Sequence, residues 1–328
     1  HHGVWINNSA PPSERLFYAT GEEKTIAELP DGYGLRYKAS DNWLLNHMVH
    51  NLVPDPMTLY VTYTIDFIPD GSPAAEGIIP TKPIWMDVES GIYPVFDVLK
   101  DSGGADGEFT YPEDAPDAYP PGWQKNEKTI PEDGVLVGTT GHVHTGGLST
   151  NLYLKRDGAS YAGPACAPRK DYSARLRKLK AKKKKFAKKR KAVARKYSSN
   201  VKRRKVKRLK RKTKKYGKKL AAVRKQDKKA RKAFRACRST QPRVEGNRVH
   251  LFDSKAKYFH ETGPVSWDMS MFSTDEDWRV EVKAGDTLEL QTTYETEIAS
   301  WYESMGINIV YMAPPENAPN PYETRVDY

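Results

Sequence analysis

The chain has 328 residues with 54 Lys or Arg and 41 Asp or Glu, which gives a formal net charge of +13. No apolar run approaches the roughly 20 residues that a membrane-spanning helix needs, and the two cysteines form no CxxC zinc pattern. Residues 169–238 hold 37 of the basic and 2 of the acidic residues, so the rest of the chain carries a net charge of −22. The sequence therefore predicts an acidic body, long enough for two domains, and a very basic segment.

The first part of the chain is typical of β structure followed by a connection. Residues 59–67 largely alternate between apolar and polar side chains, which predicts a strand. Residues 101–133 are rich in Pro, Gly and Asp, which favours a link between domains. We place the boundary near Lys125, with an N-terminal domain over 1–125 and a C-terminal domain over 126–328. Because the chain begins with His, we also expect a segment that precedes it.

The motif Gly-His-Val-His-Thr-Gly-Gly follows at residues 141–147. Side chains at positions i and i+2 of a strand project from the same face. His142 and His144 would therefore present two imidazole nitrogens to one metal ion. A strand that carries two surface histidines is the alternative interpretation.

Apolar residues of the basic segment recur at alternating steps of three and four residues, over 172–197 and again over 206–234. This spacing predicts two antiparallel helices that form a coiled-coil hairpin over residues 167–238, inserted in the C-terminal domain. Cys166 and Cys237 flank the hairpin, and a disulfide between them would join its base. Such a bond indicates an oxidising, extracytoplasmic setting; the alternative is two free thiols.

Two further strands are predicted at 278–282 and 287–290, joined by a hairpin-like turn at 283–286. Pro and Gly interrupt the rest of the body at short intervals, so we expect a mainly β, sandwich-like fold. Several single residues have no partner cluster in the sequence and are expected in the core or at the surface: His250, His260, Met269, Met271 and Met312.

The remaining histidines and one methionine suggest a metal. Six of the eight histidines form three clusters, and Met305 lies in an aromatic-rich stretch near the C-terminus; the clusters are His1/His2, His47/His50 and His142/His144. Imidazole nitrogens bind several transition metals, whereas the soft thioether sulfur of Met favours Cu(I). This donor set indicates copper. His47 and His50 face opposite sides of a regular strand, so only one of them would be a ligand.

In this order the motifs resemble the copper type II, ascorbate-dependent monooxygenases, the family of peptidylglycine α-hydroxylating monooxygenase and dopamine β-monooxygenase. His1-His2-Gly-Val-Trp resembles the family's His-His pair, and Met48-Val49-His50-Asn51 resembles its single later histidine. Gly-His-Val-His at 141–144 resembles its His-x-His, and Glu303-Ser304-Met305 its methionine strand. The His-x-His motif is also similar to that of nodulin-related plant stress proteins. The resemblance covers residues 1 to about 314, without the basic segment.

The resemblance implies two jelly-roll-like β-sandwich domains with one copper ion each. His1, His2 and His50 would hold an electron-supplying copper, with His50 favoured over His47 by its neighbours. His142, His144 and Met305 would hold the copper at which O2 is activated. Ascorbate or another one-electron donor would supply electrons, and a C–H bond of an organic substrate would be hydroxylated. The substrate stays open, because Thr140 stands where peptide-hydroxylating members have an Arg.

Two other classes of function are compatible with the sequence. One is a non-catalytic copper-binding or structural surface protein. The other is a binding protein whose basic hairpin attracts an anionic cell-envelope polymer, anionic lipid or nucleic acid through counterion release. The basic segment lacks interleaved aromatic residues for base stacking, which favours an envelope surface over nucleic acid. A solvated helical surface that balances the acidic body is the remaining interpretation.

Overall fold

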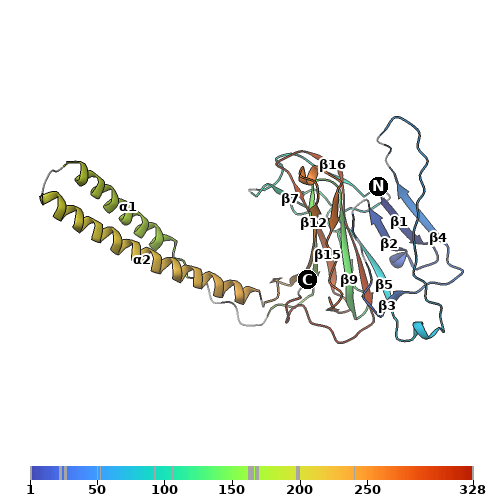
Figure 1. Ribbon diagram of the computed structural model, residues 1–328. Coiled ribbons are helices and arrows are strands. Elements are labelled where there is room, and N and C mark those ends of the chain that lie inside the picture. Colours follow the sequence, from blue (N-terminus) through green and yellow to red (C-terminus); the bar gives the residue numbers. More distant parts are fainter. Residues whose placement is uncertain are drawn as a thin grey trace. The chain divides into compact units, whose positions relative to one another are not determined.

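The computed structural model (Figure 1) describes residues 2–21, 24–25, 28–49, 51, 53–91, 94–104, 106–161, 166, 170–196, 200–239 and 241–326. Among these residues the fold is mainly β, with 17 strands and two α-helices, as the sequence predicts. The chain divides into two compact units. Residues 1–162 together with 242–328 form the body, and residues 163–241 form the basic unit.

Two large sheets make up most of the body. The seven-stranded sheet has the order β11 (Val244–Glu245), β12 (Arg248–Tyr258), β10 (Gly147–Lys155), β15 (Thr287–Glu295) and β7 (Glu108–Tyr111), with β13 (Met269–Met271) paired to β12 and β8 (Glu127–Thr129) paired to β15. The five-stranded sheet has the order β14 (Val280–Val282), β9 (Gly134–Val143), β17 (Gly306–Ala313), β5 (Ile79–Asp87) and β3 (Tyr33–Leu35). Only β3 and β5 pair in parallel among the described strands.

Side chains of both large sheets share one hydrophobic core. Alternation along β15 places Leu288 and Leu290 in this core, while Glu289 lies on the other face of the strand. Leu136 and Val310 of the five-stranded sheet reach the same core. So do three methionines for which no metal role was expected, Met269, Met271 and Met312.

The predicted boundary near Lys125 does not coincide with the division of the structure. β3, β5 and β7 come from before residue 125, yet they pair with strands from after it in the two large sheets. The structure divides the chain next to residues 162 and 241 instead.

A smaller sheet lies against the five-stranded sheet. It contains β2 (Leu16–Gly21), β1 (His2–Asn7) and β4 (Trp43–Met48), with β1 in the centre. Ala19 of β2 packs against a second apolar cluster that includes Val137 and Ile309 of the five-stranded sheet. The Tyr311 hydroxyl of β17 also donates to the Phe17 carbonyl of β2 at 3.1 Å. The remaining elements are a two-stranded sheet of β16 (Trp301–Ser304) and β6 (Phe96–Val98), and three 3-10 turns, Pro12–Glu14, Pro73–Ala75 and Gly263–Val265.

Two local predictions about strands were wrong. The described structure has no strand at 59–67, because these residues form no backbone hydrogen bond with another described segment. Their large apolar side chains are exposed, including Tyr60 at 87% and Phe67 at 78%. The turn at 283–286 is present, with the Asp286 N–H donating to the Lys283 carbonyl at 3.0 Å. It does not close a hairpin, however, since β14 and β15 belong to different sheets.

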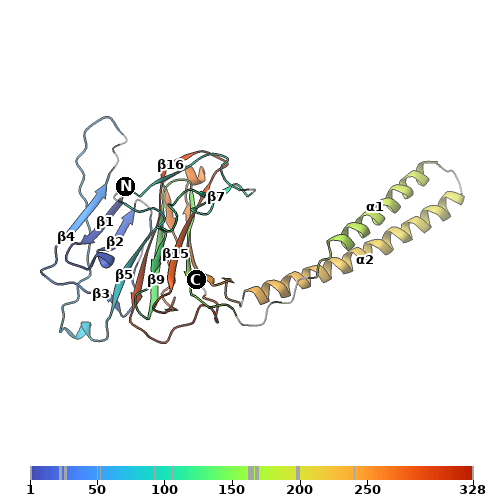
Figure 2. The same cartoon turned by 180° about the vertical axis from the view of Figure 1, so that it is seen from behind.

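The basic unit contains the two predicted helices, α1 (Ser173–Lys196) and α2 (Asn200–Arg238). They lie side by side in both views (Figures 1 and 2), and the rings of Phe186 and Tyr216 stack between them with centroids 5.4 Å apart. The Asp171 carboxylate accepts a hydrogen bond from the Ser173 N–H at 2.7 Å, which satisfies one donor where α1 begins.

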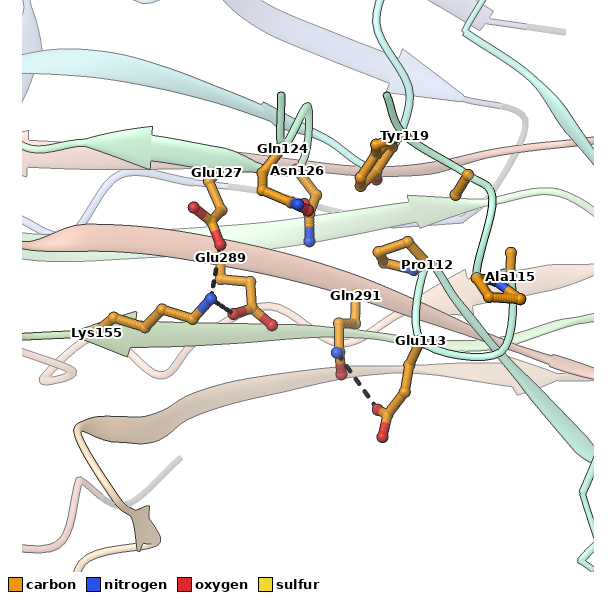
Figure 3. Close-up of a pocket in the computed structure, with 12 residues that line it drawn as sticks. Pro112, Glu113, Ala115, Tyr119, Gln124, Asn126, Glu127, Lys155, Glu289 and Gln291 are labelled. Carbon is orange, nitrogen blue, oxygen red and sulfur yellow. Dashed lines mark hydrogen bonds and ion pairs between the residues drawn. The ribbon is translucent and has the colours of Figure 1, made fainter. Parts of the chain in front are cut away.

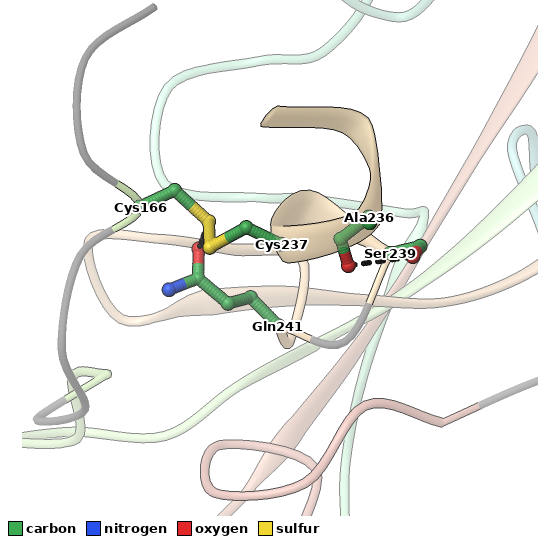
Figure 4. Close-up of a disulfide and its surroundings, with 5 residues drawn as sticks. All are labelled: Cys166, Ala236, Cys237, Ser239 and Gln241. Atoms are coloured by element: carbon green, nitrogen blue, oxygen red, sulfur yellow. Dashed lines mark hydrogen bonds between the residues drawn. A yellow bond between two sulfur atoms is a disulfide. The ribbon is translucent and has the colours of Figure 1, made fainter. Parts of the chain in front are cut away.

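The predicted disulfide between Cys166 and Cys237 is present (Figure 4), with the two Cα atoms 5.9 Å apart. Gln241 lies beside it, with its side-chain oxygen 3.0 Å from the Cys166 sulfur. The bond therefore connects the chain ahead of α1 to the last turn of α2.

No helix in the described part of the chain combines the length and the apolar character that crossing a membrane requires.

Candidate metal centre

Three histidines from two sheets come together in the body. His142 lies on β9, His144 follows just after that strand ends, and His2 is the first residue of β1. One ligand nitrogen from each lies within 4.8 Å of the other two. The ring centroids of His142 and His144 are 5.3 Å apart, and the His2 ring is 5.7 Å from the first and 6.1 Å from the second. The expected pairing of His142 with His144 is thus found, together with a third imidazole.

The inclusion of His2 differs from the sequence expectation, which placed it in a separate site with His1 and His50. The register of β9 and β17 explains the difference. His142 lies opposite Ile307, on the face of the five-stranded sheet that also presents Ile309 and Tyr311. The small sheet covers this face, so β1 brings His2 to β9.

The other predicted ligands have different positions. His1 and His50 lie outside the described residues. His47 is exposed and pairs with Gly3, whereas Met48 pairs with His2. Because consecutive strand residues face opposite sides, His47 points away from the face that carries His2.

Met305 is buried beside His144, and Tyr294 connects the main chains of the two residues. The Tyr294 hydroxyl accepts hydrogen bonds from the N–H of His144 at 3.1 Å and from the N–H of Met305 at 3.0 Å. It donates to the Met305 carbonyl at 2.7 Å. Tyr294 has no exposed surface and Met305 is 2% exposed. One phenol oxygen therefore holds two of the predicted ligand residues next to each other.

A buried carboxyl group and an aromatic ring lie close to the histidines. Asp87 of β5 lies opposite Ile307, which in turn lies opposite His142. Burial raises the pKa of Asp87 to about 8. The Glu89 N–H and the Trp85 indole donate hydrogen bonds to its carboxyl group, and His142 lies close to it; these interactions lower the pKa but do not offset the effect of burial. The ring of Trp267 contacts His144 with centroids 5.3 Å apart.

These neighbours could not be recognised from local sequence patterns. Tyr294 is separated from Met305 by 11 residues and from His144 by 150. Asp87 belongs to β5, which pairs with β17, and β17 in turn pairs with the strand that carries His142. Tyr294 stands in a largely polar stretch of β15 and Asp87 is the last residue of β5, so no local pattern marks either residue as part of a site.

The three imidazoles fit a transition metal. Imidazole nitrogens bind such an ion at about 2.0–2.1 Å, so two of them in a tetrahedral site are about 3.3 Å apart. The present separations of up to 4.8 Å would need side-chain adjustments of about 1.5 Å or less. Copper, zinc, iron and nickel all suit imidazole ligands.

A pocket that lies elsewhere contains none of these residues. It is a cavity of about 300 Å³ that is lined by Glu289 and Gln291 of β15, by Lys155 of β10 and by side chains from residues 112–127 (Figure 3). Lys155 there pairs with Glu127 at 2.6 Å and with Glu289. The Gln291 amide donates to Glu113 at 3.5 Å. Because these polar groups satisfy one another, the histidine cluster is the stronger candidate for chemistry.

No family model, curated protein or solved structure matches this chain. Its function is therefore inferred from its own residues.

Proposed function

We propose that His2, His142 and His144 bind copper and that the protein is a copper-dependent monooxygenase. The observation that carries this proposal is the convergence of three imidazoles within 4.8 Å. The reaction would convert a C–H bond, O2, two electrons and two protons into an alcohol and water. Ascorbate or another one-electron donor would supply the electrons, and the organic substrate is undetermined.

The choice of copper depends on Met305 and on the resemblance to the ascorbate-dependent monooxygenases. A thioether is a soft ligand that favours Cu(I), so a set of His and Met donors suits a metal that cycles between two oxidation states. When bound, copper would supply one-electron redox chemistry and a coordination position for O2. The protein would hold the imidazoles, and Tyr294 would keep His144 and Met305 in place.

This proposal changes the ligand set inferred from the sequence. His2 would join His142 and His144 at one ion, instead of belonging to an electron-supplying copper with His1 and His50. A second copper bound by His1 and His50 stays a prediction, because both lie outside the described residues.

Copper content of single and double variants tests the shared centre. We expect His2→Ala and His142→Ala each to remove the same one equivalent of copper, and the double variant to remove no more. If the two single variants remove different equivalents and the double variant loses both, the histidines serve two separate sites. His47→Ala is the matched control, since His47 faces away from His2, and it should keep its copper.

Ascorbate-dependent O2 consumption tests the enzymatic part of the proposal. We expect consumption by the copper-loaded protein and its loss in His142→Ala. Copper binding with the expected stoichiometry but without O2 consumption would instead indicate the non-catalytic copper-binding protein.

We also propose finer features of the fold and its location. The shared core of the two large sheets supports a jelly-roll-like β-sandwich for the body. Partly buried positions of α2 follow steps of three and four residues from Val206 to Cys237, which supports an antiparallel coiled coil. The Cys166–Cys237 disulfide supports an extracytoplasmic location.

A further inference from the structure

The basic unit has a charged surface that the proposed metal centre does not use. In α1, 14 of 24 residues are Lys or Arg and none is acidic. In α2, 21 of 39 residues are Lys or Arg and only Asp227 is acidic. At 1.5 Å per residue, α2 alone would carry this charge over about 58 Å. Lys and Arg side chains at this density repel one another and attract polyanions.

The apolar side chains of the two helices are used within the unit. Phe186 stacks on Tyr216, and the ammonium groups of Lys182 and Lys212 lie over these rings at 5.8 and 5.3 Å. Leu220 and Val223 are buried. Among the described residues of α1 and α2, no large hydrophobic side chain is exposed. The described outer surface of the two helices therefore has no large apolar side chain to insert into a membrane and no exposed aromatic ring on which a base would stack.

The positive charge is present on opposite sides of the helix pair. Phe186 of α1 and Tyr216 of α2 mark the sides that face each other. Residues on the far side of α1 include Lys184, Lys188 and Lys191, and those on the far side of α2 include Lys214, Lys218 and Lys225; all six are exposed. A flat lipid surface contacts only one side of such a pair. Duplex DNA, which is stiff over about 150 base pairs, is limited in the same way.

We propose that the basic unit binds a flexible, linear anionic polymer of a cell envelope, which winds around both helices. A flexible chain reaches lysines on both sides and releases more counterions than a flat or stiff partner. Lys predominates over Arg in both helices, and Lys is a point charge without the fixed fork of Arg. Recognition would therefore depend on charge density and chain flexibility. This function is independent of the metal centre.

The test uses the full-length, disulfide-bonded protein and three probes: linear polyphosphate, duplex DNA with the same number of phosphates, and vesicles that contain anionic phospholipid. Affinity is measured between about 50 and 200 mM salt. We expect polyphosphate to bind most tightly and to lose at least about a thousand-fold in affinity over this range, as expected for six or more phosphate contacts.

Two matched variants test the winding. One replaces Lys184, Lys188 and Lys191 with Gln, and the other replaces Lys214, Lys218 and Lys225 with Gln. Each should weaken polyphosphate binding and reduce the salt slope by about 2–3, because each removes three phosphate contacts. Helix content by circular dichroism should not change, since Lys and Gln have similar helix propensities.

Four results would overturn the proposal. Sensitivity to only one of the two variants would indicate a partner that contacts one side. Tighter binding of duplex DNA would indicate nucleic acid, and tighter binding of vesicles would indicate a membrane. Absence of polyphosphate binding at about 150 mM salt would indicate a solvated surface, because a polyanion that contacts six or more cationic side chains keeps a measurable affinity at that ionic strength.

Discussion

Replacement of Tyr294 by Phe removes one oxygen atom that is hydrogen bonded to both His144 and Met305. Tyr294 has no exposed surface, so solvent cannot easily replace that oxygen. The variant removes the acceptor that both buried N–H groups use, at a cost of about 1–3 kcal/mol for each lost hydrogen bond. We therefore expect the free energy of unfolding to fall by about 2–6 kcal/mol, out of the 5–15 kcal/mol that is usual for a whole domain.

Urea denaturation followed by tryptophan fluorescence measures this loss, and Tyr322→Phe is the matched control. Tyr322 is also buried, at 3% exposed. Its hydroxyl donates to the carbonyls of Leu154 and Asn247 at 3.0 and 2.7 Å. Its removal leaves carbonyl oxygens under-satisfied but no buried N–H, which costs about 1 kcal/mol. If Tyr294→Phe is no more destabilising than Tyr322→Phe, the hydrogen bonds of Tyr294 do not hold His144 and Met305 in place.

Four further results are expected. Copper at about 100 times its dissociation constant should raise the free energy of unfolding by about 2.7 kcal/mol and slow amide exchange in β1 and β4, because the ion would link His2 to β9; unchanged exchange in the small sheet would contradict this. Met305→Leu should reduce ascorbate-dependent O2 consumption while costing less than about 1.5 kcal/mol of stability, since it conserves apolar volume; full activity would exclude the thioether as a ligand. Burial and the nearby Arg243 lower the pKa of His250 from its usual 6.5 to about 3. The unfolded state therefore binds more protons, and the free energy of unfolding should fall as the pH decreases from about 6.5 towards 3. His250→Gln should reduce this dependence on pH, and an identical pH profile would contradict the assignment. Reduction of the disulfide, which has a sequence separation of 71, should destabilise the basic unit by about 4 kcal/mol and leave the β signal of the body in circular dichroism intact; loss of that signal would mean that the body also depends on the disulfide.

The basic unit and several strands could be predicted from the sequence because their signals are local. Steps of three and four residues place side chains on one side of a helix, and α1 and α2 occur where that pattern predicts them. Cys166 and Cys237 were identified from their positions at the two ends of the pattern. Alternation along 287–290 similarly predicts β15. Within the candidate centre, the proximity of His142 and His144 follows from strand geometry alone.

Other features depend on pairing between distant segments. Residues 59–67 have a strand-like pattern, but a strand also needs a hydrogen-bonding partner, and the described structure provides none. The two strands around 283–286 are adjacent in sequence but belong to different sheets.

The composition of the candidate centre was decided in the same way. His2 joins His142 because the small sheet covers one face of β9 and β17, and the register of these two strands places His142 on that face. Tyr294 reaches His144 and Met305 because β15 and β17 contribute to a common core. Sequence periodicity determines which face of a strand a residue occupies, but only tertiary packing determines what that face meets.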